Sequence, residues 1–168
     1  MIRQQPEKMC LNNRNIYHKF IKSSIKEKQL LAPVIKQLAL VDEANFSGLL
    51  AWYYLNIKPQ NSENLIAAQG WAVKAIAAGS VEAKYHLAWI LWKSNPKDDD
   101  IRRNLREVVK SKTGAFIEAA SDLGLAYLIG VGGSTSTRWA VYWLEYAAAR
   151  GDKLAKKRLL DVASKSQK

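Results

Sequence analysis

The sequence has few of the residues that build metal, redox or disulfide sites. It contains one cysteine, Cys10, and two histidines, His18 and His86, in 168 residues. A single cysteine excludes an internal disulfide, and these three residues do not match the ligand spacing of a zinc site. We therefore expect no metal and no cofactor. Only four prolines occur and apolar residues make up 48% of the chain, which argues against wholesale disorder.

Long apolar runs are also missing. No stretch approaches the ~18 apolar residues of a membrane span. The first fifteen residues contain no apolar segment long enough for the core of a signal peptide. We expect a cytoplasmic protein, or a periplasmic one if an export signal preceded this chain.

Charge is concentrated at the two ends. The net charge is +11, of which residues 1–37 contribute +6 and residues 150–168 contribute +5, so the middle is neutral. Basic ends favour an acidic protein, an anionic lipid surface or nucleic acid by long-range attraction. The alternative is two solvated terminal helices. The basic residues form no compact arginine-rich run and match no nucleic-acid motif.

The clearest positive signal is an internal repeat. Six residues recur 72 positions apart, which is twice 36. The earlier set is Ala68, Trp71, Ala75, Gly79, Ala83 and Leu87, and the later set is Ala140, Trp143, Ala147, Gly151, Ala155 and Leu159. A period of this length is typical of stacked helical hairpins, which bury their apolar faces only against neighbouring hairpins.

Apolar spacing and helix-ending residues predict nine helices joined by short connections. The expected ranges are 14–24, 27–41, 44–57, 62–78, 81–94, 99–112, 115–129, 137–149 and 152–165. Short connections favour antiparallel neighbours. The predicted fold is an all-α solenoid of antiparallel helix pairs, with three to four repeats of about 36 residues. We expect a basic capping segment at 1–37, the repeat domain at 38–165 and a tail at 166–168.

One stretch carries a specific family pattern. It contains Ala120, Leu123, Gly124, Tyr127, Gly130 and Gly132, followed by Ala140, Trp143, Ala147, Ala148, Gly151, Ala155 and Leu159. This pattern resembles the Sel1-like repeat family, relatives of the tetratricopeptide repeat. The acidic residue usual after the glycine loop is missing here. The resemblance implies a scaffold that holds a protein or peptide.

Candidate catalytic features are weak. Asp98, Asp99 and Asp100 suggest a cation site, but a helix cap is the preferred interpretation. The glycines from 130 to 133 lack the lysine and hydroxyl ending of a phosphate loop and follow a helix instead of a strand. For His86 a rim position is preferred to a catalytic one. No nucleophile and base pair is found, so we do not expect an enzyme.

Binding residues are predicted by analogy with tetratricopeptide stacks, where the first helix of each pair lines the concave face. Aromatic side chains there favour partner recognition, although they could equally pack against the next helix. Trp71, Trp139 and Trp143 are expected in the core. The predicted partner-binding residues are Leu49, Tyr53, Tyr85, His86, Trp89 and Leu125.

The resemblance suggests an adaptor, a regulator or an immunity protein. Our leading hypothesis is a small bacterial immunity-type protein that binds and neutralises one cognate secreted toxin, which we expect to be acidic. A general adaptor with several weaker partners is the alternative among binding proteins. A peripheral membrane or nucleic-acid binder that uses the basic ends is the alternative from another class.

Overall fold

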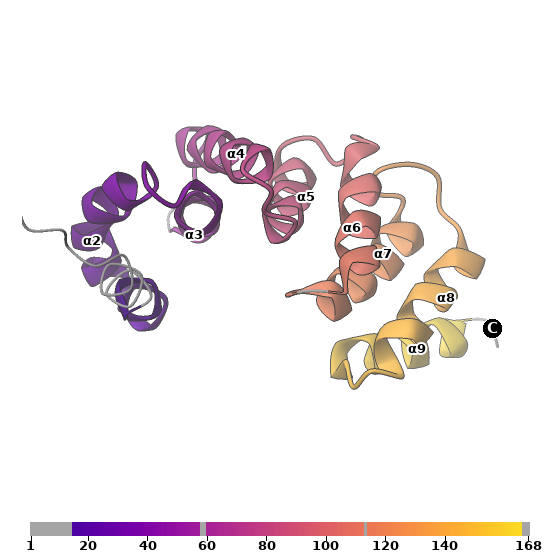
Figure 1. Cartoon of the computed structure of the whole chain (residues 1–168). Coiled ribbons are helices and arrows are strands. Elements are labelled where there is room, and N and C mark those ends of the chain that lie inside the picture. Colours follow the sequence, from indigo (N-terminus) through magenta and orange to yellow (C-terminus); the bar gives the residue numbers. More distant parts are fainter. Residues whose placement is uncertain (1–14, 58–59, 113, 166–168) are drawn as a thin grey trace, which may run out of the picture. The chain divides into compact units, whose positions relative to one another are not determined.

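The computed structural model describes residues 15–57, 60–112 and 114–165, and in these parts of the chain helices are joined by turns and loops, without a strand (Figure 1). Residues 15–22 form a first helix. The helices that follow are α2 (Ile25–Leu38), α3 (Glu43–Asn56), α4 (Ser62–Ala77), α5 (Glu82–Ser94), α6 (Asp100–Ser111), α7 (Phe116–Ile129), α8 (Thr137–Ala148) and α9 (Lys153–Lys165). The predicted helices are confirmed within a few residues at each end. The fold is an all-α solenoid in which successive helices of a pair pack together.

The chain divides into two compact units, Met1–Gly79 and Ser80–Lys168. In unit 1, α3 packs against α2 and α4, around a core that includes Phe20, Ile35 and Phe46. In unit 2, α5 to α9 pack successively around a core that includes Leu105 and Leu123. The division between the units falls inside the predicted repeat domain, 38–165. The predicted boundary at residue 38 stays a prediction, and residues 1–14 and 166–168 lie outside the described parts.

Local sequence explains where the helices begin. Ser24 forms a capping box with Glu27, in which each side chain bonds the other residue's backbone N–H. Asp42, Asn61 and Ser136 each accept a backbone N–H of the first turn that follows. These side chains satisfy N–H groups that have no partner within the helix.

The 72-residue repeat has a structural counterpart. The paired alanines are all fully buried: Ala68 and Ala140, Ala75 and Ala147, and Ala83 and Ala155. Gly79 and Gly151 follow α4 and α8 with φ of 93° and 97°, a backbone conformation that favours glycine. Equivalent positions therefore have the same structural role in each copy: the alanines are buried and the glycines follow the end of a helix.

The prediction that Trp139 lies in the core is wrong, because 48% of this residue is exposed. Trp71 and Trp143 are partly buried and pack against the cores of units 1 and 2. Among the described residues, no helix is both long and apolar enough to span a membrane.

Candidate functional site

A buried carboxylate joins two helices of unit 2. Asp122 lies within α7 and is only 6% exposed. The Tyr85 hydroxyl donates to Asp122 Oδ2 at 2.9 Å, and the Trp89 indole N–H donates to the same oxygen at 3.1 Å. Tyr85 and Trp89 lie one turn apart on α5. The carboxylate therefore fixes the orientation of two aromatic rings.

The third helix of this arrangement is α9. Arg158 Nη1 donates to the Ser121 carbonyl at 2.9 Å and to Ser121 Oγ at 2.8 Å. The same nitrogen lies 3.5 Å from Asp122 Oδ1, so the guanidinium partly compensates the buried charge. Through these bonds, side chains tie α5, α7 and α9 together.

Burial shifts the pKa values of two residues of this network. It raises the pKa of the Asp122 carboxyl, and the bonds from Tyr85, Trp89 and Arg158 offset only part of that effect. Burial, and then the negative charge of Asp122, raise the pKa of the Tyr85 hydroxyl. Tyr85 thus stays a hydrogen-bond donor at physiological pH. A nearly inaccessible carboxylate that already accepts three donors is suited to holding side chains in place.

We define the Asp122 face as Tyr85, Trp89, Trp92, Asp122 and Leu125. Trp89 stacks on Trp92 with ring centroids 5.1 Å apart and an angle of 12° between the planes. Tyr85, Trp89, Trp92 and Leu125 are all partly exposed. Three predicted binding residues therefore belong to this face: Tyr85 and Trp89, which bond a buried anchor that the sequence analysis did not identify, and Leu125, one turn along α7 from that anchor.

The remaining predicted binding residues have other environments. His86 is partly buried beside Tyr85, with ring centroids 6.4 Å apart. Leu49 and Tyr53 are 4% and 6% exposed and belong to the core of unit 1. Phe20, from the helix at 15–22, packs edge-on against Tyr53 at 5.5 Å. Capping by this helix leaves Leu49 and Tyr53 little surface for a partner.

A second buried charge supports the glycine loop. Arg102 of α6 is 7% exposed and donates to the carbonyls of Val131, Ala126 and Gly133 at 2.6, 2.9 and 3.1 Å. A Cβ on Gly132 would lie 3.1 Å from Arg102 Cγ, so only a small residue fits there. The loop carbonyls therefore bind a side chain of the protein itself, which agrees with the expectation that this is a structural loop.

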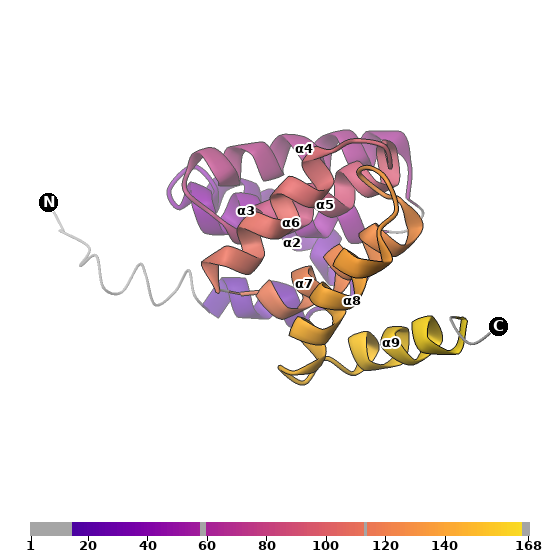
Figure 2. The same cartoon turned by 90° about the vertical axis from the view of Figure 1, so that its right-hand side faces the viewer.

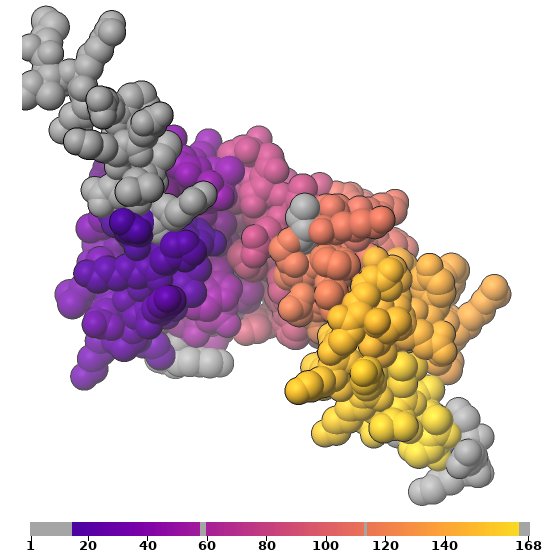
Figure 3. Space-filling model, turned by 60° about the horizontal axis from the view of Figure 1, so that its bottom comes forward, coloured from indigo at the N-terminus to yellow at the C-terminus, as the bar shows by residue number. Residues whose placement is uncertain are grey.

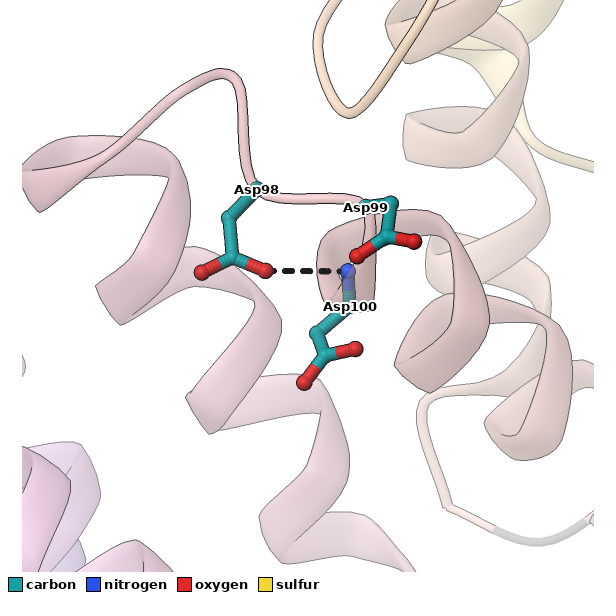
Figure 4. Close-up of side chains that lie close together, drawn as sticks. All are labelled: Asp98, Asp99 and Asp100. Atoms are coloured by element: carbon teal, nitrogen blue, oxygen red, sulfur yellow. Dashed lines mark hydrogen bonds between the residues drawn. The ribbon is translucent and has the colours of Figure 1, made fainter.

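At the start of α6, Asp98 accepts a backbone N–H, whereas Asp99, at the N-cap position, makes no side-chain capping bond (Figure 4). Asp98 Oδ1 accepts the backbone N–H of Asp100 at 3.0 Å, and Asp100 pairs with Arg103. One carboxylate oxygen from each aspartate lies within 4.8 Å of the others. The first two contacts account for Asp98 and Asp100 as helix-terminus groups, as the sequence analysis preferred.

Asp122, Arg158 and Arg102 were missed by the sequence analysis. A usable signal exists for the first two, because Arg158 follows Asp122 by 36 residues and Asp122 follows His86 by 36. With a repeat of 36 residues, Asp122 corresponds to His86, which lies in the same helical turn as Tyr85 and Trp89. Arg102 has no comparable signal, since it lies among several other basic residues of α6.

Comparison with known proteins addresses the fold. No family model and no curated protein matches the sequence. Among solved structures, a Sel1 repeat protein from Oxalobacter formigenes is similar, with 26% sequence identity and a TM-score of 0.55. The similarity covers 77% of this chain and 97% of the other. This likeness confirms the Sel1-like helical repeat fold and supports a scaffold for protein interactions.

Proposed function

We propose that this Sel1-like repeat chain is a non-catalytic module that binds a partner protein through the Asp122 face. The observation that carries the proposal is the anchoring of Tyr85 and Trp89 by the buried Asp122 carboxylate. Aromatic rings fixed before binding lose little conformational entropy in a complex, and such residues contribute much of the energy of protein interfaces. The partly exposed Trp92 extends this surface along α5, and the partly exposed Leu125 extends it along α7.

The finer proposal is one dedicated, acidic partner. The net charge of +11 favours association with an acidic protein by long-range attraction. Within this proposal, the chain is an immunity-type protein that blocks one secreted toxin by covering its surface. Occlusion requires no catalytic group, which fits a carboxylate saturated by three donors.

Capture of the partner tests the proposal at two salt concentrations. The tagged full chain is incubated with its native lysate at about 150 mM and about 500 mM salt, and bound proteins are identified. Contacts dominated by apolar area should survive the higher salt, whereas charge-driven contacts weaken. We expect one stoichiometric acidic protein at both concentrations. Several substoichiometric proteins would instead support a general adaptor, and lipid or nucleic acid bound at low salt alone would contradict the proposal.

Two matched variants locate the interface. Leu125→Glu adds a negative charge to the Asp122 face, and Leu160→Glu makes the same change at a 71% exposed position of α9. We expect Leu125→Glu to lose the partner and Leu160→Glu to keep it. Equal retention by both would exclude the Asp122 face. The activity of the purified partner, measured with and without the chain, tests neutralisation, and full activity in the complex would contradict the immunity role.

A further inference from the structure

Five aromatic residues form a continuous row on unit 2. We define the α8 ridge as Tyr127 of α7 with Trp139, Tyr142, Trp143 and Tyr146 of α8. Successive ring centroids along the row are 6.4, 5.7, 5.0 and 6.0 Å apart. Residues three and four apart share one side of a helix, so α8 presents this row along its length.

Three residues of the ridge, Tyr127, Trp143 and Tyr146, pack against the core of unit 2 and stay partly exposed. α8 lies beside α7 and leads through a turn into α9 (Figure 2). Its buried side consists of Ala140, Leu144 and Ala147, all fully buried. Trp139 and Tyr142 are 48% and 52% exposed. Single exposed aromatics are common on proteins, but a contiguous row of them marks an interaction surface.

Guanidinium groups lie at both ends of the ridge. Arg106 donates to the Tyr127 hydroxyl at 3.3 Å, and Arg150 lies over the Tyr146 ring at 3.6 Å. Both arginines are exposed. Glu145 is the single acidic residue of α8, and it lies about 120° around the helix from Trp139. The ridge therefore combines exposed rings with positive charge at its ends.

We propose that the α8 ridge is a second docking surface, which binds an extended acidic segment of a partner protein. Trp, Tyr and Arg are the residue types most enriched among interface hot spots. From Trp139 to Ala148 the helix rises about 14 Å, and Arg150 follows two residues beyond this end. About five residues of extended chain span that length. The segment thus carries carboxylates at least about five residues apart, with apolar residues between them.

The geometry favours a peptide over other anionic partners. The ring planes of Trp139 and Tyr142, and of Tyr142 and Trp143, meet at 85° and 83°. Successive bases of a single strand prefer separate stacking faces and a track of cations along the backbone. A lipid surface prefers cations spread over a plane. The ridge, a single row of rings with cations at its ends, has neither the arrangement that a nucleic-acid strand prefers nor the one that a lipid surface prefers.

This surface is separate from the Asp122 face. Tyr127 follows Asp122 by five residues and therefore lies about 140° around α7 from it. Residues 137–165, coloured orange to yellow in Figure 3, are widely exposed in that view. The two proposals can consequently fail independently.

Selection from a library of random 12-residue displayed peptides tests the ridge with the full chain as bait. The variant Trp139→Ser with Tyr142→Ser serves for counter-selection, because both residues are about half exposed and neither belongs to the buried core of unit 2. Leu154→Ser, at a 51% exposed position of α9, is the matched control. We expect recovered peptides to be acidic with apolar centres. They should bind at least about tenfold more weakly to the double variant and to Arg150→Gln, and equally to Leu154→Ser and Leu125→Glu.

Several outcomes would overturn the proposal. Peptides that bind the double variant as well as the original chain, or that show no acidic bias, would exclude the ridge or its stated partner. A library that yields no discriminating peptide would do the same. Ridge-dependent binding of vesicles of 30% phosphatidylglycerol in phosphatidylcholine, or of a 12-nucleotide oligothymidine, in place of peptides would assign the ridge to lipid or nucleic acid.

Discussion

Arg158 and Asp122 stand 36 residues apart, at the same position of successive repeats, and form an ion pair with Nη1 and Oδ1 separated by 3.5 Å. One position of the repeat thus supplies a cation on α9 and an anion on α7. The Asp122 carboxylate also accepts hydrogen bonds from Tyr85 and Trp89 of α5. Helices that lie one repeat apart are tied by polar side chains as well as by apolar packing.

Removal of the Asp122 carboxylate should destabilise unit 2. In Asp122→Ala, the buried donors of Tyr85 and Trp89 lose their acceptor, and Arg158 loses its counter-charge. We expect a decrease of about 2–4 kcal/mol in the free energy of unfolding. Asp122→Asn retains an acceptor oxygen and should lose about 1 kcal/mol. Urea unfolding followed by circular dichroism compares the two, and equal losses would contradict the hydrogen-bonded anchor.

The raised pKa of Asp122 should make the stability of the chain depend on pH. Because burial raises the pKa of Asp122 in the folded state, the folded chain binds more protons than the unfolded chain between the two pKa values. The Asp122 contribution to stability is therefore present below the unfolded pKa, about 4, and is lost as pH rises through the folded pKa. We expect the stability of the original chain relative to Asp122→Asn to fall across this range. Urea unfolding of both proteins from pH 3 to pH 7 measures it, and a constant difference would exclude the raised pKa.

Replacement of each of two helical glycines by alanine should change the stability of the chain in opposite directions. A Cβ on Gly124 would lie 2.6 Å from Leu144 Cγ and 3.1 Å from the Ala140 carbonyl oxygen, where α7 and α8 meet. Gly124→Ala should lower stability by about 1–3 kcal/mol through overpacking. Gly70 of α4 has nothing within 4 Å of the same position, so Gly70→Ala should raise stability by about 0.5–1 kcal/mol. Thermal unfolding distinguishes them, and stabilisation by both would mean that α7 and α8 pack less closely.

Substitution of two neighbouring arginines on α6, Arg102 and Arg103, should change the free energy of unfolding by very different amounts. Arg102→Met removes three bonds, two to carbonyls of the glycine loop and one to the Ala126 carbonyl of α7, and we expect a loss of about 2–4 kcal/mol. Arg103 makes an exposed ion pair with Asp100, so Arg103→Gln should change stability by at most about 0.5 kcal/mol. Hydrogen exchange at the N–H groups of Val131 and Gly132, which donate to the carbonyls of Ala126 and Pro96, provides a local measure. Unchanged protection in Arg102→Met would show that the loop holds its shape without this side chain.

The pattern of apolar and small residues was sufficient to predict the helices and the repeat. The alanines that recur 72 residues apart are all buried, and Gly79 and Gly151 adopt the same backbone conformation. These features are local, because a helix boundary depends on its own capping residues and on its own apolar period. For the same reason, the sequence placed Tyr85 and Trp89 on one side of α5.

Tertiary packing decided which aromatic side chains reach the surface. Tyr53 and Trp89 are 36 residues apart and were both predicted to bind a partner, yet Tyr53 is buried against Phe20 whereas Trp89 is held by Asp122 and stays partly exposed. Trp139 shares its helix with Trp143 but has 48% of its surface exposed. The exposure of a side chain depends on what its neighbours in space cover, and helical periodicity does not specify those neighbours.

The sequence by itself determined an all-α repeat with its helix boundaries, its glycine turns and its buried alanines, because these follow from interactions within one helix or one hairpin. The tertiary structure alone decided that Asp122 is a buried anchor, that Arg102 supports the glycine loop and that α8 carries a partly exposed aromatic row. The first two features depend on contacts between residues about 20 to 40 positions apart, and the third depends on which residues the neighbouring helices of unit 2 cover. A burial pattern along one helix does not contain that information.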